Sequence, residues 1–169
     1  MSYKDSPRIE LRGRLDSLNA RIILLQSESD SAEYIADLEE LRAVVNRLQR
    51  CEACGENFGD DFTLWGLGSE ELHTRSHNPA MYCGLGHIMP HHEMGRLAAG
   101  LNVLRTLVRE TELCAVRAFS PAACPYGVGD DDGLRICHVL NRLSSAVYVL
   151  MYKYLPEGYS RVIRFGSSG

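Results

Sequence analysis

Two arginines and a glutamate lie along one line of a helical stretch, LNVLRTLVRETEL, at residues 101–113. Arg105, Arg109 and Glu112 are spaced four and three residues apart, which places them on the same side of an α-helix. Apolar residues border this line, so it is narrower than an ordinary solvated face. Intrahelical Arg–Glu pairs would explain it, but so would a partner subunit or a polyanion such as a nucleoside triphosphate, which planar guanidinium groups bind well.

Three further polar residues suit the same kind of site. Asp16 lies in GRLDSLNARI, off the leucine stripe of its helix, and is a plausible partner for one of the arginines. Asn102 falls on the line of Arg105 and is a candidate cofactor contact. Asn141 lies in LNRLSSAVYVLMY beside an almost entirely apolar run. Because a buried asparagine needs hydrogen-bond partners, Asn141 is expected to be a structural bridge or a ligand contact.

The elements that must position these residues are helices with apolar residues at helical spacing. Four are predicted, at about 9–26, 31–50, 92–119 and 133–155. Ser31 is a candidate cap for the second, and Ser69 for a short helix, SEELHTRSH, before the third. Alternation of β-branched residues is scarce, so no sheet is required. The predicted fold is therefore all-α: an up-down, ferritin-like bundle of four to five helices with a long Cys- and His-rich crossover.

The length and composition are those of one soluble domain. The 169 residues are 45% hydrophobic and 24% charged, and a single domain over 1–169 is expected, with its core at about 9–155 and a short extended or disordered tail at 156–169. The net charge of -4 and the lack of a basic block argue against nucleic acid as a partner. Charges within the first 30 residues argue against a signal peptide or membrane span, so a cytoplasmic location is expected.

Potential metal ligands are concentrated in the crossover. They are Cys51, Cys54, His73, His77, Cys83 and His87. A C-x-x-C pair has the bite for one tetrahedral metal, and histidines four apart on a helix can share one, so Zn²⁺ or Fe²⁺ is a candidate for the first five of these residues. The spacing is not that of a standard zinc finger. The alternative is separate roles, with a loop cysteine pair and histidines that cap turns or line a pocket.

Taken together, these segments resemble the ATP:cob(I)alamin adenosyltransferases, and most closely the ethanolamine-utilisation branch of that family. The likeness covers roughly residues 9–155 and rests on three motifs in order. These are L-D-S-L-N at 15–19, R-x-x-x-R-x-x-E at 105–112 and L-N-R-L-S at 140–144. Longer runs, such as GLGSEELHTRSHNP and GRLAAGLNVLRTLVRETE, also follow that branch.

The resemblance implies a helical bundle that assembles as a homotrimer, with sites at the subunit interfaces. Its implied reaction transfers the 5′-deoxyadenosyl group from ATP, with Mg²⁺, to a reduced corrinoid, giving adenosylcobalamin and triphosphate. Asp16 would pair with Arg105 across a subunit boundary, and Arg109 would contact the ATP phosphates; these are the predicted catalytic residues. Glu112 would hold the ribose or orient neighbouring groups, and Asn141 would lie at the nucleotide site. Association with a bacterial microcompartment is a further implication.

The sequence departs from the family pattern in ways that keep other functions open. The opening MSYKDSPRIELRG has neither a T-x-T-G-D-x-G loop for ATP nor the metal-binding extension of ethanolamine-type enzymes, which suggests a shortened enzyme or a non-catalytic corrinoid carrier or sensor. His87 and its neighbours replace an aromatic residue below cobalt, so His87 would ligate cobalt or point away. A helical di-metal carboxylate protein is a third possibility, but its E-x-x-H match, Glu70 to His73, lies in the crossover.

Overall fold

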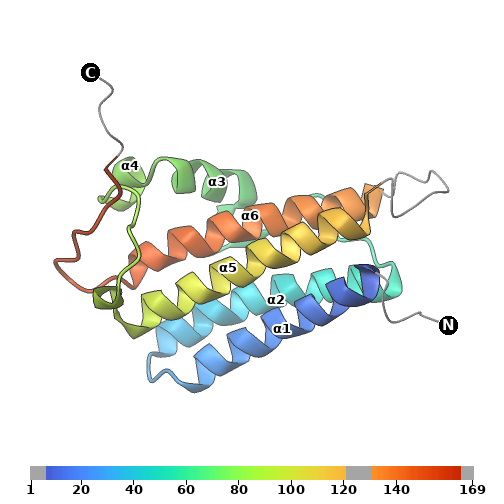
Figure 1. Ribbon diagram of the computed structural model, residues 1–169, viewed down its shortest axis with the longest axis horizontal. Helices are drawn as coiled ribbons and strands as arrows, with labels where there is room; N and C mark the ends of the chain where they lie inside the picture. Colours follow the sequence, from blue (N-terminus) through green and yellow to red (C-terminus); the bar gives the residue numbers. More distant parts are fainter. Residues whose placement is uncertain (1–6, 121–130, 165–169) are drawn as a thin grey trace.

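Four long helices lie side by side in the computed structural model, which describes residues 7–120 and 131–164 (Figure 1). They are α1 (Pro7–Ser27), α2 (Ala32–Cys54), α5 (Gly95–Ala118) and α6 (Asp131–Lys153). α1 packs against α2 and α5, α6 packs against α5 and α2, and each contacting pair is antiparallel. The predicted all-α, up-down bundle is confirmed. None of the described helices is long and apolar enough to cross a membrane.

The crossover between α2 and α5 runs along the whole bundle, because these two helices point in the same direction (Figure 1). It contains β1 (Thr63–Leu64), β2 (Leu67–Gly68), α3 (Ser69–His77), α4 (Pro79–Cys83) and the 3₁₀ turn η2 (His92–Met94). β1 and β2 form a minimal antiparallel hairpin, the only sheet in the described ranges. α3 and α4 both pack against α6, so the crossover covers one side of the bundle.

The core follows the apolar stripes of the helices. On α1, Leu11, Leu15, Leu18 and Ile22 recur at helical spacing and are buried. They join buried residues of the other long helices and the crossover in one hydrophobic cluster. Since each fully buried leucine contributes roughly 2 kcal/mol, this packing rather than helix propensity holds the bundle together.

The ends of α2 and α3 were predicted only in part. Ser31 caps α2 as predicted, accepting a hydrogen bond from the Tyr34 N–H at 3.3 Å. α2 then continues past residue 50 to Cys54, where Gly55 adopts φ +67° and closes the helix. The prediction that Ser69 caps α3 was wrong, because Gly68 is the capping residue and Ser69 already lies in the helix.

The predicted third helix is divided at its start. Gly95 has φ +79°, a conformation that separates η2 from α5, and a Cβ there would lie 3.3 Å from Cγ of Pro156. α6 spans residues 131–153 rather than 133–155, since Pro156 disfavours helical geometry in the residue before it. Most of the predicted loop at 120–133 lies outside the described residues, as does Cys124.

A buried carboxylate joins α2 to the end of α6. Asp37 is 7% exposed, and its Oδ2 accepts hydrogen bonds from Lys153 Nζ at 2.7 Å and from the Tyr154 hydroxyl at 2.5 Å. Removing the carboxylate would leave the Tyr154 hydroxyl without its partner and Lys153 with only Glu33, at 2.8 Å, which is a costly change at a partly buried position.

We therefore expect Asp37→Ala to lower the free energy of unfolding by about 2 kcal/mol in urea denaturation. Arg42→Ala is the matched control on the same helix, because Arg42 pairs at the surface with Glu39, three residues earlier, and it should cost clearly less than Asp37→Ala. Equal losses in the two variants would contradict the role assigned to Asp37.

Candidate functional site

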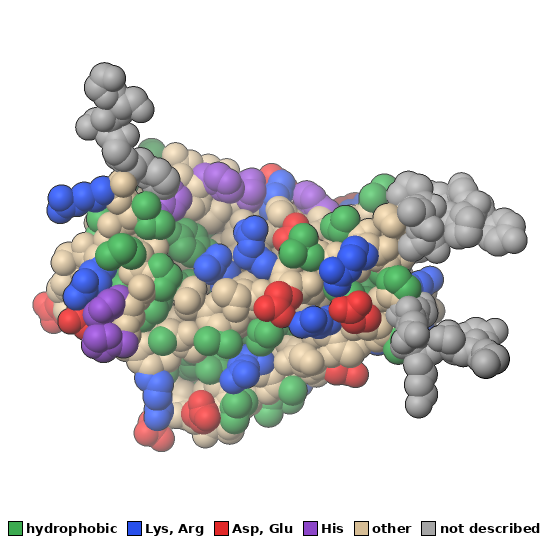
Figure 2. All heavy atoms as spheres, in the orientation of Figure 1, with side chains coloured by type: hydrophobic (Ala, Val, Ile, Leu, Met, Phe, Trp, Pro, Cys, Tyr) green, Lys and Arg blue, Asp and Glu red, His purple; other side chains and the backbone are tan. Residues whose placement is uncertain are grey.

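A hollow of about 170 Å³ lies where α3, α5 and α6 meet. It is lined by Ser76, His77, Arg105, Arg109, Ser144, Ser145 and Tyr148. Two residues of the predicted line on α5 therefore border the hollow, the half-buried Arg105 and the exposed Arg109. On the face shown in Figure 2, Lys and Arg side chains gather along α5 and α6, with His side chains above them over α3.

The two arginines carry positive charge that no carboxylate in the described residues neutralises through an ion pair. Arg105 is half-buried and donates to Asn102 Oδ1 at 3.2 and 3.4 Å. Burial, together with the neighbouring Arg109, lowers the pKa of Arg105. The intrahelical Arg–Glu pairing considered from the sequence is not what the structure contains. Two close guanidinium groups without a counter-ion are suited to a multiply charged anion.

Glu112 belongs instead to a bridge between α5 and α6. Its Oε1 accepts from Asn141 Nδ2 at 2.9 Å, and Asn141 Oδ1 accepts from Arg142 Nη1 at 2.8 Å. Arg142 also donates to Glu70 Oε1 of α3 at 2.8 Å. Asn141 is thus a structural bridge, one of the two roles that the sequence left open. The chain of contacts fixes the three helices that enclose the hollow.

Asp16 lies elsewhere, at a second hollow of about 200 Å³ between α1 and α2. Its Oδ1 accepts from Gln49 Nε2 at 2.7 Å, so within this chain it is paired with α2 and not with Arg105. Glu52 lies beside it with a fully buried side chain that bonds Arg8 and Arg12. The neighbouring Asn19 has a buried Oδ1 without a hydrogen-bond partner.

The five predicted metal ligands do not come together in the described structure. Cys51 and Cys54 lie on the last turn of α2 rather than in a loop, and Cys83 ends α4. His73 and His77 are neighbours on α3, with ring centroids 4.3 Å apart. They make local contacts: His73 Nδ1 lies 3.2 Å from Ser145 Oγ, and His77 Nδ1 donates to the His73 carbonyl at 3.0 Å.

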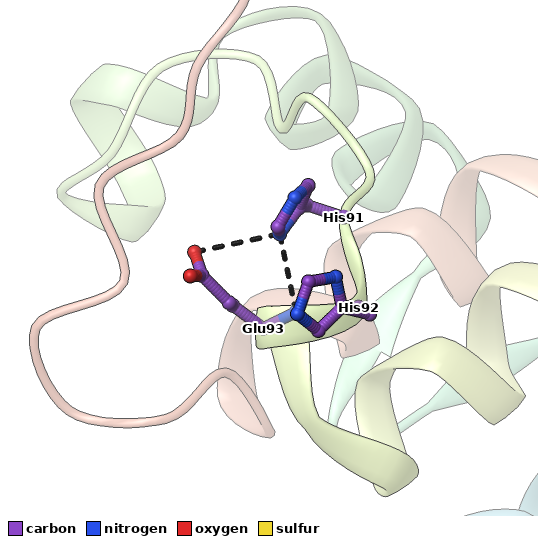
Figure 3. Close-up of side chains that lie close together, drawn as sticks. All are labelled: His91, His92 and Glu93. Atoms are coloured by element: carbon purple, nitrogen blue, oxygen red, sulfur yellow. Dashed lines mark hydrogen bonds and ion pairs between the residues drawn. The ribbon is translucent and has the colours of Figure 1, made fainter.

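Three potential ligands do converge at the start of α5. His91, His92 and Glu93 place one ligand atom each within 4.8 Å of one another, the only such group of three in the described ranges (Figure 3). Their contacts have a structural explanation. His91 Nδ1 accepts from the Glu93 N–H at 3.3 Å and so caps η2, while Glu93 Oε2 is ion-paired with Arg161 at 2.7 Å.

His87 does not line the arginine hollow, but it contacts Tyr148, which does. Its Nδ1 is 3.2 Å from the hydroxyl of Tyr148, whose ring stacks on the imidazole and whose side chain lines the hollow. Sequence reasoning did not single out Tyr148, Ser144 or Ser145. The available signal was spacing, since they follow Asn141 by seven, three and four residues on one face of α6.

The cysteine pair at the end of α2 permits a direct test. Cys54 is exposed, whereas Cys51 is 7% exposed and burial raises its pKa. Because the thiolate is the reactive form, iodoacetamide should modify Cys54 at least about tenfold faster than Cys51 in the folded protein, followed by peptide mass spectrometry. The urea-unfolded protein is the control and should show similar rates. Protection of both thiols that a chelator removes would contradict this expectation and indicate a shared metal.

Comparison with known proteins identifies the family of this chain. The profile of the family described as "Cobalamin adenosyltransferase" matches residues 1–154. The protein named "Corrinoid adenosyltransferase EutT" from Escherichia coli (strain K12) is 39% identical over 151 residues, which is 89% of this chain and 54% of the relative. Its namesake from Salmonella typhimurium is 38% identical over the same shares. The chain spans about half the length of these curated relatives. It belongs to the cobalamin adenosyltransferase family.

Proposed function

We propose that this chain transfers the 5′-deoxyadenosyl group of ATP to a reduced corrinoid and releases triphosphate. The observation that carries the proposal is the hollow in which Arg105 and Arg109 lie without a carboxylate counter-ion among the described residues. Membership of the family supports ATP as the anion bound here, because the named relatives are corrinoid adenosyltransferases. A triphosphate is an anion whose charge two adjacent guanidinium groups match.

In this reaction the reduced cobalt of the substrate attacks the 5′ carbon of ATP. A cobalt–carbon bond forms while the carbon–oxygen bond breaks, and the electron pair of that bond leaves on the triphosphate. Arg105 and Arg109 would stabilise the negative charge that grows on the leaving group. The hydroxyls of Ser144 and Ser145 line the same hollow and would donate to phosphate oxygens, whereas the Ser76 hydroxyl donates to the His73 carbonyl. Mg²⁺ would enter with ATP, since substrate phosphates and water usually supply most of its ligands.

The remaining predicted residues would orient the two substrates. Glu112 and Asn141 hold α5 against α6, and in this proposal they would fix the nucleoside end of ATP. His87 is linked to the hollow through Tyr148, so we assign the corrinoid to the side of segment 87–92. Bringing the cobalt and the 5′ carbon together in this way is the main contribution that a protein can make to such a displacement.

The complete site would require more than one copy of the chain. Asp16 opens onto a different hollow from the one that holds Arg105 and Arg109. α5 also presents large apolar side chains to solvent, including Leu113 at 62% and Val116 at 50% exposure, which a neighbouring subunit would cover. A head-to-tail ring of three subunits would set the Asp16 hollow of one copy against the arginine hollow of the next.

The first test is an anaerobic assay with ATP, Mg²⁺ and chemically reduced cob(I)alamin, followed by the visible spectrum of the adenosylated product. Arg109→Ala should lower kcat/KM for ATP by about a hundredfold, because one of the two charges that meet the triphosphate is lost. Arg42→Ala is the matched control, since Arg42 lies on α2 and pairs only locally with Glu39. It should leave kcat/KM within about twofold of the wild-type value.

Other outcomes distinguish the rival functions. Full activity in Arg109→Ala would remove the phosphate contact from the proposal. A wild-type protein that forms no product but shifts the corrin spectrum on mixing would be a corrinoid carrier or sensor. A wild-type protein that does neither would contradict both functions.

A site shared between subunits predicts complementation. Asp16→Asn and Arg109→Ala should each be nearly inactive, but co-assembly of the two variants at equal amounts should restore about a quarter of the wild-type sites, because random mixing gives that fraction both intact groups. Arg105→Ala mixed with Arg109→Ala is the control. Both residues belong to one hollow of one chain, so this mixture should recover no activity. Recovery in neither mixture, with assembly confirmed by sedimentation, would place the whole site within a single chain.

A further inference from the structure

The hydroxyl of Tyr148 is a junction between α6 and the crossover. It accepts a hydrogen bond from the backbone N–H of Ile88 at 3.0 Å, lies 3.2 Å from His87 Nδ1 and lies 3.0 Å from the hydroxyl of Tyr152. Tyr152 in turn donates to the carbonyl of Gly86 at 2.8 Å. Two tyrosines one turn apart on α6 therefore hold three consecutive residues of the crossover.

The direction of each hydrogen bond in this chain follows from counting protons. Tyr152 has one hydroxyl proton and gives it to the Gly86 carbonyl, so its oxygen must accept from Tyr148. Tyr148 has then used its own proton, and its oxygen can only accept from Ile88 and from His87. His87 must therefore carry a proton on Nδ1. Burial, with the Tyr148 hydroxyl beside it, raises the pKa of Tyr152, which keeps the Tyr152 hydroxyl protonated at neutral pH.

The ring of Tyr148 makes a second contact, with Arg105. The Arg105 guanidinium carbon lies 5.8 Å from the centroid of this ring, within the range of a cation–π interaction. The same side chain lines the arginine hollow. Arg105 is half-buried beside Arg109, and a ring face is a source of electrostatic stabilisation that leaves the guanidinium donors available to a ligand.

We propose that Tyr148 is a positioning residue that couples the two halves of the site, its hydroxyl fixing segment 86–88 and its ring holding Arg105 at the hollow. This inference rests on the proposed function for the identity of the two substrates. Segment 86–88 would support the corrinoid, and Arg105 would meet the triphosphate. One side chain would then set the distance between the attacking cobalt and the phosphate anchor, on which an in-line displacement depends.

Two substitutions separate the two contacts. Tyr148→Phe keeps the ring and removes the junction, whereas Tyr148→Leu removes both. In Tyr148→Phe we expect hydrogen exchange of the Ile88 amide to become about tenfold faster and KM for the corrinoid to rise about five- to tenfold, while KM for ATP stays within about twofold. In Tyr148→Leu we expect KM for ATP to rise about tenfold as well, because Arg105 loses its supporting ring.

Tyr154→Phe is the matched control. It also removes a tyrosine hydroxyl at the end of α6, but that hydroxyl bonds Asp37, away from the hollow. It should lower stability without changing either KM or the exchange of Ile88. A purely structural role for Tyr148 would make Tyr148→Phe behave like Tyr154→Phe, and that result would overturn the inference.

The inference and the proposed function can fail separately. An active wild-type enzyme whose two KM values respond equally to Tyr148→Phe and Tyr148→Leu would overturn the inference and leave the function intact. A wild-type protein without adenosyltransferase activity would overturn the function. Exchange of the Ile88 amide would still decide the junction in that case: tenfold acceleration in Tyr148→Phe would support it, and unchanged exchange would overturn it.

Discussion

α2 and α5 point in the same direction, and the rest of the structure depends on this constraint. The chain that leaves the end of α2 must return along the full length of the bundle before α5 can begin (Figure 1). It does so along α6, and it places α3 and α4 on that helix. Ser76 and His77 of α3 thereby become one wall of the arginine hollow. A shorter connection would leave Arg105 and Arg109 on an open helix face, without an enclosed site.

The second determinant of the site is charge that the protein leaves uncompensated. Most arginines of the described chain have a carboxylate within ion-pair distance, as Arg142 has in Glu70 and Arg161 has in Glu93. Glu112 is the nearest acidic side chain along the α5 line, yet Asn141 occupies its Oε1. Keeping the half-buried Arg105 beside Arg109 without a carboxylate costs folding free energy, which a bound polyanion would offset. Unneutralised charge at this point is therefore better explained by binding than by stability.

The sequence predicted the four helices well, because buried stripes such as Leu11 to Ile22 have the period of a helix and dominate the packing energy. It also predicted that Arg105, Arg109 and Glu112 share a face. It did not predict what would lie opposite that face. The hydroxyl of Tyr148, for example, accepts a hydrogen bond from the backbone N–H of Ile88, which is 60 residues away in the chain. Spacing within one helix carries no information about such partners.

The predicted metal cluster of cysteines and histidines failed for the same reason, because spacing along the chain does not tell which residues meet in the fold. The proximity of these residues along the sequence suggested one cluster, but the crossover spreads them over the bundle. Gly55 lets α2 run through Cys54, which fixes both cysteines on a helix, while His73 lies on α3. Convergence depends on where the crossover docks, and that is decided by buried residues such as Leu72 and Ile88 rather than by the ligands themselves.

The hollow between α1 and α2 holds Asp16, the one predicted catalytic residue that lies away from Arg105 and Arg109. The side chain of Glu52 is wholly buried and bonds Arg8 and Arg12, so it ties α2 to α1 at this end of the bundle. Asp16 is exposed at the mouth, with Gln49 as a partner that solvent or a cation could replace. Asn19 lies outside the lining of this hollow, three residues after Asp16 on α1, and keeps a buried acceptor unsatisfied, an arrangement that folded proteins generally avoid. The arginine hollow on the opposite set of helices offers donors in excess. Asp16, Glu52 and Arg12 line the α1–α2 hollow, so it carries both signs of charge, whereas Arg105 and Arg109 line the other hollow without a carboxylate. A head-to-tail interface is the geometry that brings two such unlike surfaces of identical chains together.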